Sequence, residues 1–174
     1  MAGYIALGSN VGEREEHLRA AVLGLAAGGL TLTGVSSVWE TEPVGAAGPA
    51  WFLNMVVRVT GGAAPEQVLD LLLAIEGSRG RVRARPDAPR ELDLDLLTWE
   101  GERRDTPSLT LPHPRLWGRR FVLAPLEELA PDLVDPATGR TVSQTLAALP
   151  EVPVARRLGK LALPETLPVY SRAL

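Results

Sequence analysis

Leucines and acids alternate along the stretch RELDLDLLTWEG at residues 90–101. Because a β-strand sends successive side chains to opposite faces of a sheet, Asp93 and Asp95 share one face and the leucines between them share the other. In the same register, the apolar side chains of Leu97 and Trp99 continue the acidic face. We therefore expect that face to be covered along part of its length. A covered carboxylate must be paired or must bind a metal.

The rest of the chain divides into segments with strand or helix patterns. Runs of apolar and β-branched residues predict strands, and apolar residues at helical spacing predict helices. The expected strands cover residues 3–7, 30–40, 52–59 and the acidic stretch, and the expected helices cover 13–27, 65–77, much of 121–131 with an interruption near Pro125, and 141–150. The order β-α-β-β-α-β, followed by helices, predicts an α+β sandwich with a mainly antiparallel sheet and helices packed on both sides.

The length of 174 residues fits one domain. We expect that domain to span residues 1–149. Residues 150–174 are rich in proline and irregular, which indicates a C-terminal extension with at most one strand.

Composition narrows the range of partners. The net charge of −3 gives no electrostatic reason to expect nucleic acid or an anionic membrane. The chain has no cysteine, which excludes disulfides and thiolate metal sites and fits a reducing cytoplasm. Its start, MAGYIALGSN, lacks the basic segment of a signal peptide, and no apolar run approaches the roughly 20 residues that span a bilayer. We expect a cytoplasmic protein, and a monomer because nothing indicates an exposed apolar interface.

The paired aspartates are candidates for a metal site. Carboxylate oxygens suit Mg²⁺, which binds through one or two carboxylates together with substrate phosphates. A solvated acidic strand face is the alternative. Lys160 is the only lysine and no P-loop string occurs, so any phosphate must be held by arginine, metal or backbone N–H groups. The loop before the strand is dense in arginines that suit phosphate or surface ion pairs, namely Arg81, Arg83, Arg85 and Arg90.

Three further polar residues stand in unusual positions. Glu76 ends a helix, where its charge opposes the macrodipole, so it either pairs with the arginine loop, contacts a ligand or is simply exposed. Asn54 interrupts an apolar strand and needs partners for its amide, either from neighbouring backbone or from a flat heterocycle stacked on Phe52. His113 lies between two prolines and hence on a rigid loop. With two histidines, a His-rich metal site is excluded.

Six segments resemble a known family in the same order along the chain. They are YIALGSNVG, ETEPVG, FLNMVV, RGRVR, RELDLDLL and LPHPRLWGRRFVLAPLEELAP, and together they cover roughly residues 3–149. The set resembles 6-hydroxymethyl-7,8-dihydropterin pyrophosphokinase of folate biosynthesis. The resemblance implies a ferredoxin-like sandwich. It also implies transfer of the pyrophosphoryl group of ATP to the hydroxymethyl oxygen of the pterin, with release of AMP, and small molecules as the only partners.

The resemblance also implies roles for individual residues. Asp93 and Asp95 would hold two Mg²⁺ ions and act in catalysis together with Arg81 and Arg83. The residues implied to bind ATP are Leu69, Glu76, Arg83, Arg90, Leu96, Thr110, His113 and Arg119. The residues implied to bind the pterin are Gly8, Thr41, Pro43, Val44, Asn54 and the aromatic pair Phe52 and Phe121 that would sandwich the ring.

The chain departs from the family pattern at three positions. Asp87 stands where a tryptophan can fold over the pterin, Pro114 where an aromatic can occur, and Leu73 where a polar residue can face adenine. Two other functions stay open. One is a two-metal nucleotidyl transferase or cyclase on a ferredoxin-like sheet, which would release pyrophosphate. The other is a pterin- or nucleotide-binding module without turnover.

Overall fold

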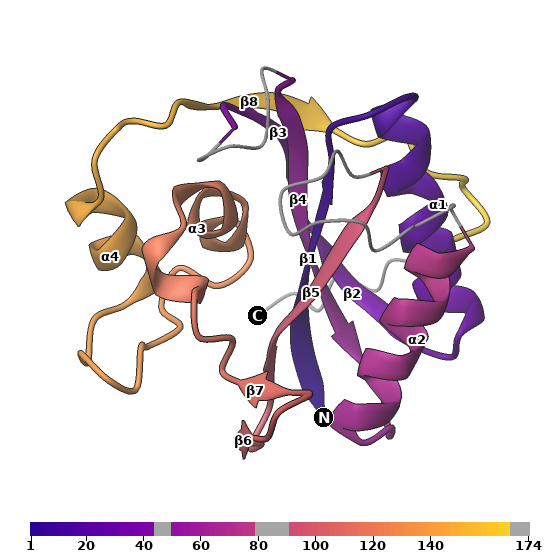
Figure 1. Ribbon diagram of the computed structural model, residues 1–174, viewed down its shortest axis with the longest axis horizontal. Helices are drawn as coiled ribbons and strands as arrows, with labels where there is room; N and C mark the ends of the chain where they lie inside the picture. Colours follow the sequence, from indigo (N-terminus) through magenta and orange to yellow (C-terminus); the bar gives the residue numbers. More distant parts are fainter. Residues whose placement is uncertain (44–49, 79–90, 168–174) are drawn as a thin grey trace.

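A six-stranded sheet runs through the middle of the computed structural model, which describes residues 1–43, 50–78 and 91–167 (Figure 1). The strand order is β5-β1-β4-β3-β8, β2 also pairs with β4, and these pairs are antiparallel. The strands are β1 (Ala2–Ser9), β2 (Thr31–Val35), β3 (Ser37–Thr41), β4 (Phe52–Thr60), β5 (Asp93–Trp99) and β8 (Ala155–Lys160). A separate two-stranded sheet contains β6 (Arg104–Asp105) and β7 (Thr110–Leu111).

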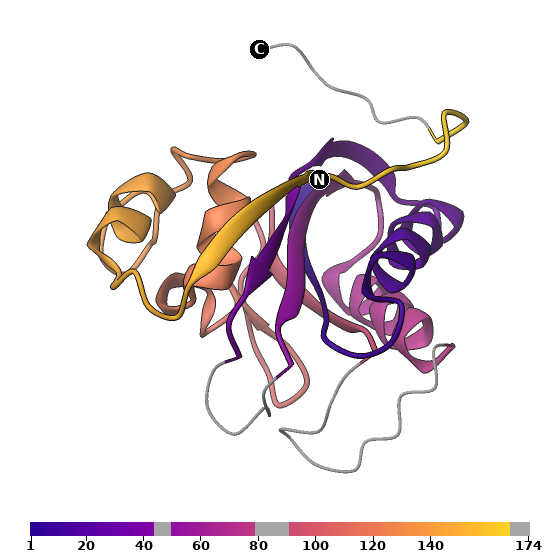
Figure 2. The same ribbon diagram turned by 90° about the horizontal axis from the view of Figure 1, so that it is seen from above.

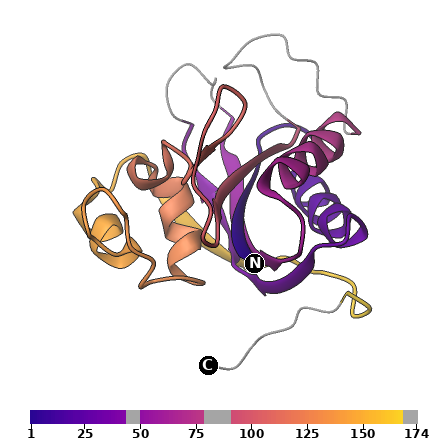
Figure 3. The same ribbon diagram turned by 90° about the horizontal axis from the view of Figure 1, so that it is seen from below.

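Helices cover both faces of this sheet (Figures 1 and 2), and Figure 3 shows the same layers from below. On one side lie α1 (Arg14–Ala27) and α2 (Pro65–Gly77), and on the other lie the 3-10 helix η1 (Leu116–Gly118), α3 (Arg120–Glu127) and α4 (Val142–Ala148). Each side has its own apolar core, called here the α1/α2-side core and the α3-side core. The predicted α+β architecture, with a mainly antiparallel sheet and helices on both sides, is confirmed. None of the helices in the described ranges has both the length and the apolar composition needed to cross a membrane.

The alternation along β5 is confirmed as far as Leu97 and then shifts. Asp93 lies opposite Gly8 and Asp95 opposite Ala6 on β1, but Leu97 is an extra residue with no opposite partner in that register. Such a bulge reverses the side-chain alternation beyond it. Leu97 therefore packs in the α3-side core on the acidic face, as predicted, whereas Trp99 packs in the α1/α2-side core. The prediction that Trp99 continues the acidic face is wrong.

Trp99 leaves no space for a side chain on the neighbouring strand. A Cβ on Gly3, opposite Trp99, would lie 2.2 Å from the Cε3 atom of the indole ring. A glycine is needed at this position because any larger residue would push the indole out of the core.

Two predicted boundaries also differ from the structure. The single strand expected over 30–40 is two strands, because Ser36 between them pairs with Val56 through its own N–H (3.0 Å) and hydroxyl (2.9 Å). The interruption expected near Pro125 does not occur, since α3 continues through it. Proline lacks an N–H and forfeits one helical hydrogen bond, and the burial of residues 122–126 holds the helix together.

The segment after Pro150 reaches the sheet. Among its residues described up to 167 there is a single strand, β8, in agreement with the prediction of at most one. This strand pairs with β3 from Ser37 to Thr41 and forms the edge of the main sheet.

Glu128 joins α3 to β3 and β8. Its carboxylate accepts hydrogen bonds from the Ser37 N–H (3.0 Å), the Ser37 hydroxyl (3.0 Å) and the Trp39 indole N–H (2.8 Å), and Lys160 Nζ lies 3.5 Å away. Burial alone would raise the pKa of Glu128, but these hydrogen bonds and the Lys160 charge outweigh burial and leave the pKa below its usual value.

We predict that Glu128→Gln lowers the free energy of unfolding by about 1 kcal/mol at pH 7, because a charged acceptor of three hydrogen bonds is lost at a partly exposed site. A depressed pKa stabilises the fold above the ordinary glutamate pKa of about 4.3 and loses that contribution as the pH falls through the folded value. The gap between the two proteins in urea unfolding should therefore close below about pH 4. The side chain of Glu127, one residue earlier, makes none of these contacts, so Glu127→Gln is the control. An equal gap at all pH values would contradict this account.

Candidate active site

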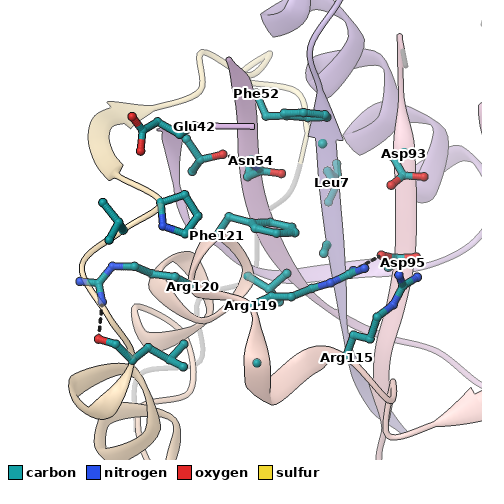
Figure 4. A pocket seen from close by; sticks show the side chains of 18 of the residues that line it. Leu7, Glu42, Phe52, Asn54, Asp93, Asp95, Arg115, Arg119, Arg120 and Phe121 are labelled. Carbon is teal, nitrogen blue, oxygen red and sulfur yellow. Dashed lines mark hydrogen bonds and ion pairs between the residues drawn. The ribbon is translucent and has the colours of Figure 1, made fainter. Parts of the chain in front are cut away.

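A cavity of about 380 Å³ lies between the sheet and α3 (Figure 4). Its volume falls in the range typical of small-molecule sites. Of the residues predicted for the site, the cavity lining contains Gly8, Thr41, Phe52, Asn54, Asp93, Asp95, Arg119 and Phe121. Strands β1, β3, β4 and β5 and the start of α3 supply these residues, so positions far apart in sequence meet at one place.

The two aspartates stand side by side on β5 and face the cavity (Figure 4). The Oδ2 atom of Asp95 lies 3.4 Å from Arg119 Nη1, and its Oδ1 atom lies 3.8 Å from His113 Nε2. Within residues 1–43, 50–78 and 91–167, no three or more metal-binding side chains gather in one place. Paired carboxylates facing an open cavity fit Mg²⁺, which takes its remaining ligands from water and phosphate oxygens.

His113 is held next to Asp95 by backbone contacts. Its N–H donates to the Leu97 carbonyl (2.8 Å), and its ring Nδ1 accepts from the Arg115 N–H (3.2 Å). Burial lowers the pKa of His113, and the charges of Arg119 and Arg115 lower it further against the opposing effect of Asp95 and Asp93. With Nδ1 as acceptor, a neutral imidazole carries its proton on Nε2, the nitrogen that faces Asp95.

Phe52 and Phe121 lie on either side of Asn54 (Figure 4). The Asn54 amide donates from Nδ2 to the Thr41 hydroxyl at 2.6 Å, which fixes the direction of the amide. A Cβ on Gly8 would lie 2.9 Å from Asn54 Oδ1, so only glycine leaves this amide undisturbed. The site therefore offers two aromatic faces and an oriented amide, a combination that suits a flat heterocycle with hydrogen-bonding edges.

Arg119 connects the aromatic and acidic parts of the cavity. Its guanidinium carbon lies 5.5 Å from the centre of the Phe121 ring, and one of its nitrogens faces Asp95. A cation in this position holds the Phe121 ring and also supplies positive charge beside the aspartates.

Glu76 is buried at the end of α2, with 2% of its surface exposed. Its Oε1 atom accepts a hydrogen bond from the Leu94 N–H at 2.8 Å, between the two aspartates in sequence. Of the possibilities that the sequence left open for Glu76, simple exposure is wrong, because the carboxylate attaches α2 to the edge strand β5. A role in ATP binding stays a prediction.

The other predicted residues do not line the cavity or lie outside the described residues. Leu69 and Leu96 pack in the α1/α2-side core, Thr110 lies in β7, and Pro43 follows β3. The predicted residues outside the described ranges are Val44, Arg81, Arg83 and Arg90. The roles implied for all of them stay predictions.

The cavity also contains residues for which the sequence predicted no role. Arg115 and Arg120 come from the same LPHPRLWGRRF segment as His113 and Arg119, and this shared motif was the available signal. Sequence reasoning also missed Glu42 and four residues of the C-terminal segment, namely Leu149, Pro150, Val152 and Pro153. The C-terminal residues carry no motif, and only the pairing of β8 with β3 shows why they reach the site.

Comparisons with known proteins agree with this geometry. A family model described as 7,8-dihydro-6-hydroxymethylpterin-pyrophosphokinase (HPPK) matches residues 4–131. The chain is 44% identical over 142 residues to the 2-amino-4-hydroxy-6-hydroxymethyldihydropteridine pyrophosphokinase of Bacillus subtilis, covering 81% of this chain and 85% of that protein. It is 42% identical over 147 residues to the protein of the same name from Methylorubrum extorquens, covering 84% and 92%.

Solved structures show the same fold at low sequence identity. A Plasmodium falciparum HPPK-DHPS crystal structure matches 84% of this chain with a TM-score of 0.65 and 12% identity. The chain spans 44% of the length of that structure's chain. From the family match and the identity to its relatives, this chain belongs to the 7,8-dihydro-6-hydroxymethylpterin-pyrophosphokinase family.

Proposed function

We propose that this chain transfers the pyrophosphoryl group of ATP to the hydroxymethyl oxygen of 6-hydroxymethyl-7,8-dihydropterin, a step of folate biosynthesis. The hydroxymethyl oxygen loses its proton and forms a bond to the β-phosphorus, the bond from that phosphorus to the oxygen that bridges it to the α-phosphorus breaks, and AMP leaves with that oxygen. The observation that carries the proposal is that Asp93 and Asp95 share one cavity with the oriented amide of Asn54 and the rings of Phe52 and Phe121.

The aromatic end of the cavity suits the pterin. We assign the ring system to the space between Phe52 and Phe121, where both of its faces lose contact with water. Asn54 presents Oδ1 as an acceptor, because its Nδ2 is already turned toward Thr41. An oriented amide in this position can read the donors and acceptors along one edge of the ring. Backbone groups of Pro43 and Val44 are assigned to the same edge.

The acidic end suits the phosphates. Asp93 and Asp95 would hold two Mg²⁺ ions, which when bound neutralise phosphate charge and favour in-line attack. Arg119 contacts Asp95 and supplies a cation at the place where phosphate charge would gather. We assign ATP binding to Arg119 and to Leu69, Glu76, Leu96, Thr110 and His113, together with Arg81, Arg83 and Arg90 from outside the described residues.

Positioning and charge neutralisation account for most of the catalysis in phosphoryl-type transfer.

We propose that the chain acts in the cytoplasm as a monomer. Both substrates are small molecules, so the reaction involves no nucleic acid. Residues 1–149 would contain all the residues that we assign to catalysis and to ATP. A nucleotidyl transferase or cyclase would use the same pair of aspartates, but the relatives at 42–44% identity are named as pyrophosphokinases.

Chromatography of the nucleotide products separates these reactions. With ATP, Mg²⁺ and the hydroxymethyl pterin, we expect AMP and pterin diphosphate in equal amounts, and no AMP when the pterin is left out. Release of pyrophosphate, or AMP formation without pterin, would contradict the proposal.

We predict that Asp93→Ala and Asp95→Ala each lower kcat by at least about 100-fold, because each removes a carboxylate from the place where phosphate charge must be neutralised. Thermal unfolding should stay close to the wild-type curve, since both side chains face an open cavity. Asp70→Ala on the exposed part of α2 is the matched control and should leave kcat unchanged. Wild-type rates in either cavity variant would remove the metal-binding role.

We also predict that Gly8→Ala raises the KM for the pterin about tenfold, since the added methyl group would displace the Asn54 amide by its close approach to Oδ1. The KM for ATP should change less than about twofold, because the atoms nearest to the added Cβ belong to Asn54 and Leu53 and none of them to Asp93. Gly62→Ala, where a Cβ meets nothing within 4 Å, is the control. Steady-state kinetics with each substrate varied in turn would reveal an equal rise in both KM values, the outcome that contradicts this assignment.

A further inference from the structure

The segment between α4 and β8 passes along the end of the cavity that lies away from the aspartates. Figure 4 shows Asp93 and Asp95 at one end and Glu42 and Arg120 at the other, with the two phenylalanine rings between them. At this far end, the lining is completed by Leu149, Pro150, Val152 and Pro153.

Two side chains attach this segment to the site. The Val154 N–H donates to Glu42 Oε2 at 2.6 Å, and the Glu42 N–H donates to the Val154 carbonyl at 3.0 Å. On the other side, Arg120 Nη1 donates to the carbonyls of Pro150 at 3.2 Å and Leu149 at 3.4 Å. The segment is therefore held at both of its ends.

Both attachment points are next to residues assigned to the pterin. Glu42 lies between Thr41 and Pro43, and Arg120 immediately precedes Phe121. A change in the position of the C-terminal segment would thus be transmitted to both sides of the space between Phe52 and Phe121. On one side it would pass through Glu42 to β3, and on the other through Arg120 to α3.

The segment closes the outer end of the cavity with an apolar surface. Its four lining side chains are apolar and none carries a charge. Two of them are prolines, whose restricted backbone lowers the entropic cost of holding the segment in one conformation. If the hydroxymethyl group points toward the aspartates, the pyrimidine end of the ring system, with its amino and oxo groups, points toward this segment, whose apolar side chains would exclude water from the hydrogen bonds that Asn54 makes to that edge.

We propose that residues 149–153 form the outer wall of the pterin compartment and contribute to pterin affinity, with Glu42 and Arg120 as positioning residues. The proposal rests on the function proposed above and assigns part of the substrate site to the C-terminal segment. We expect the wall to act on the pterin and not on ATP, because Asp93 and Asp95, which are assigned to the phosphates, lie at the other end of the cavity.

A matched pair of arginine variants tests this role. Arg120→Ala releases the wall, whereas Arg157→Ala weakens β8 away from the cavity, where Arg157 Nε contacts the Ser37 hydroxyl at 2.9 Å and Glu128 at 3.4 Å. We expect Arg120→Ala to raise the KM for the pterin about fivefold with the KM for ATP within about twofold of wild type. Arg157→Ala should change neither KM, and Arg120→Lys, which can still donate to the two carbonyls, should restore most of the pterin affinity.

Glu42→Ala provides an independent variant, which also serves if Arg120→Ala does not fold. It should raise the KM for the pterin selectively, while Glu42→Gln, which keeps an oxygen acceptor for the Val154 N–H, should stay near wild type.

Three outcomes would overturn the inference. They are equal effects of Arg120→Ala and Arg157→Ala on the KM for the pterin, a parallel rise in the KM values for both substrates, or an unchanged KM for the pterin in Arg120→Ala or Glu42→Ala. If the wild-type chain forms no AMP with the pterin, the proposed function fails and the inference fails with it. An active wild type with unaffected wall variants contradicts the inference alone.

Discussion

The two-residue period of β5 is the constraint on which the rest of the site depends. Asp93 and Asp95 face the cavity only because Leu94 and Leu96 face the opposite core, so a shift of one residue would bury the acids and expose the leucines. The hydrogen bond from the Leu94 N–H to Glu76 opposes such a shift from the outer edge of the strand. The positions of the carboxylates are thus set by a packed core and a helix, as a rigid metal site requires.

The same sheet face also carries the groups assigned to the pterin. Gly8 on β1 is opposite both Asn54 and Asp93, so a position without a side chain lies between the amide and the acid. Above this face, α3 brings Arg119 and Phe121, and the contacts of Glu128 with β3 hold that helix in place. A hydrogen-bond network outside the cavity lining therefore helps to set the distance between the Phe121 ring and the sheet.

Much of the fold and the centre of the site could be predicted from sequence, because they depend on local periodicity and short motifs. The alternation of leucine and acid placed Asp93 and Asp95 correctly. It failed at Trp99, since a bulge depends on the neighbouring strand and leaves no local signal. It also gave no indication that Leu149 to Pro153 reach the cavity, because that contact follows from long-range pairing of β8 with β3. The residue types explain contacts within an element better than contacts between elements.

The most direct measurement is a crystal structure of the chain with a non-hydrolysable ATP analogue, Mg²⁺ and the pterin bound together. The account predicts divalent cations coordinated by both Asp93 and Asp95 and bridging the phosphates, with the pterin ring stacked between Phe52 and Phe121. If both substrates were bound and the two carboxylates pointed into solvent, away from any cation, the account would be contradicted.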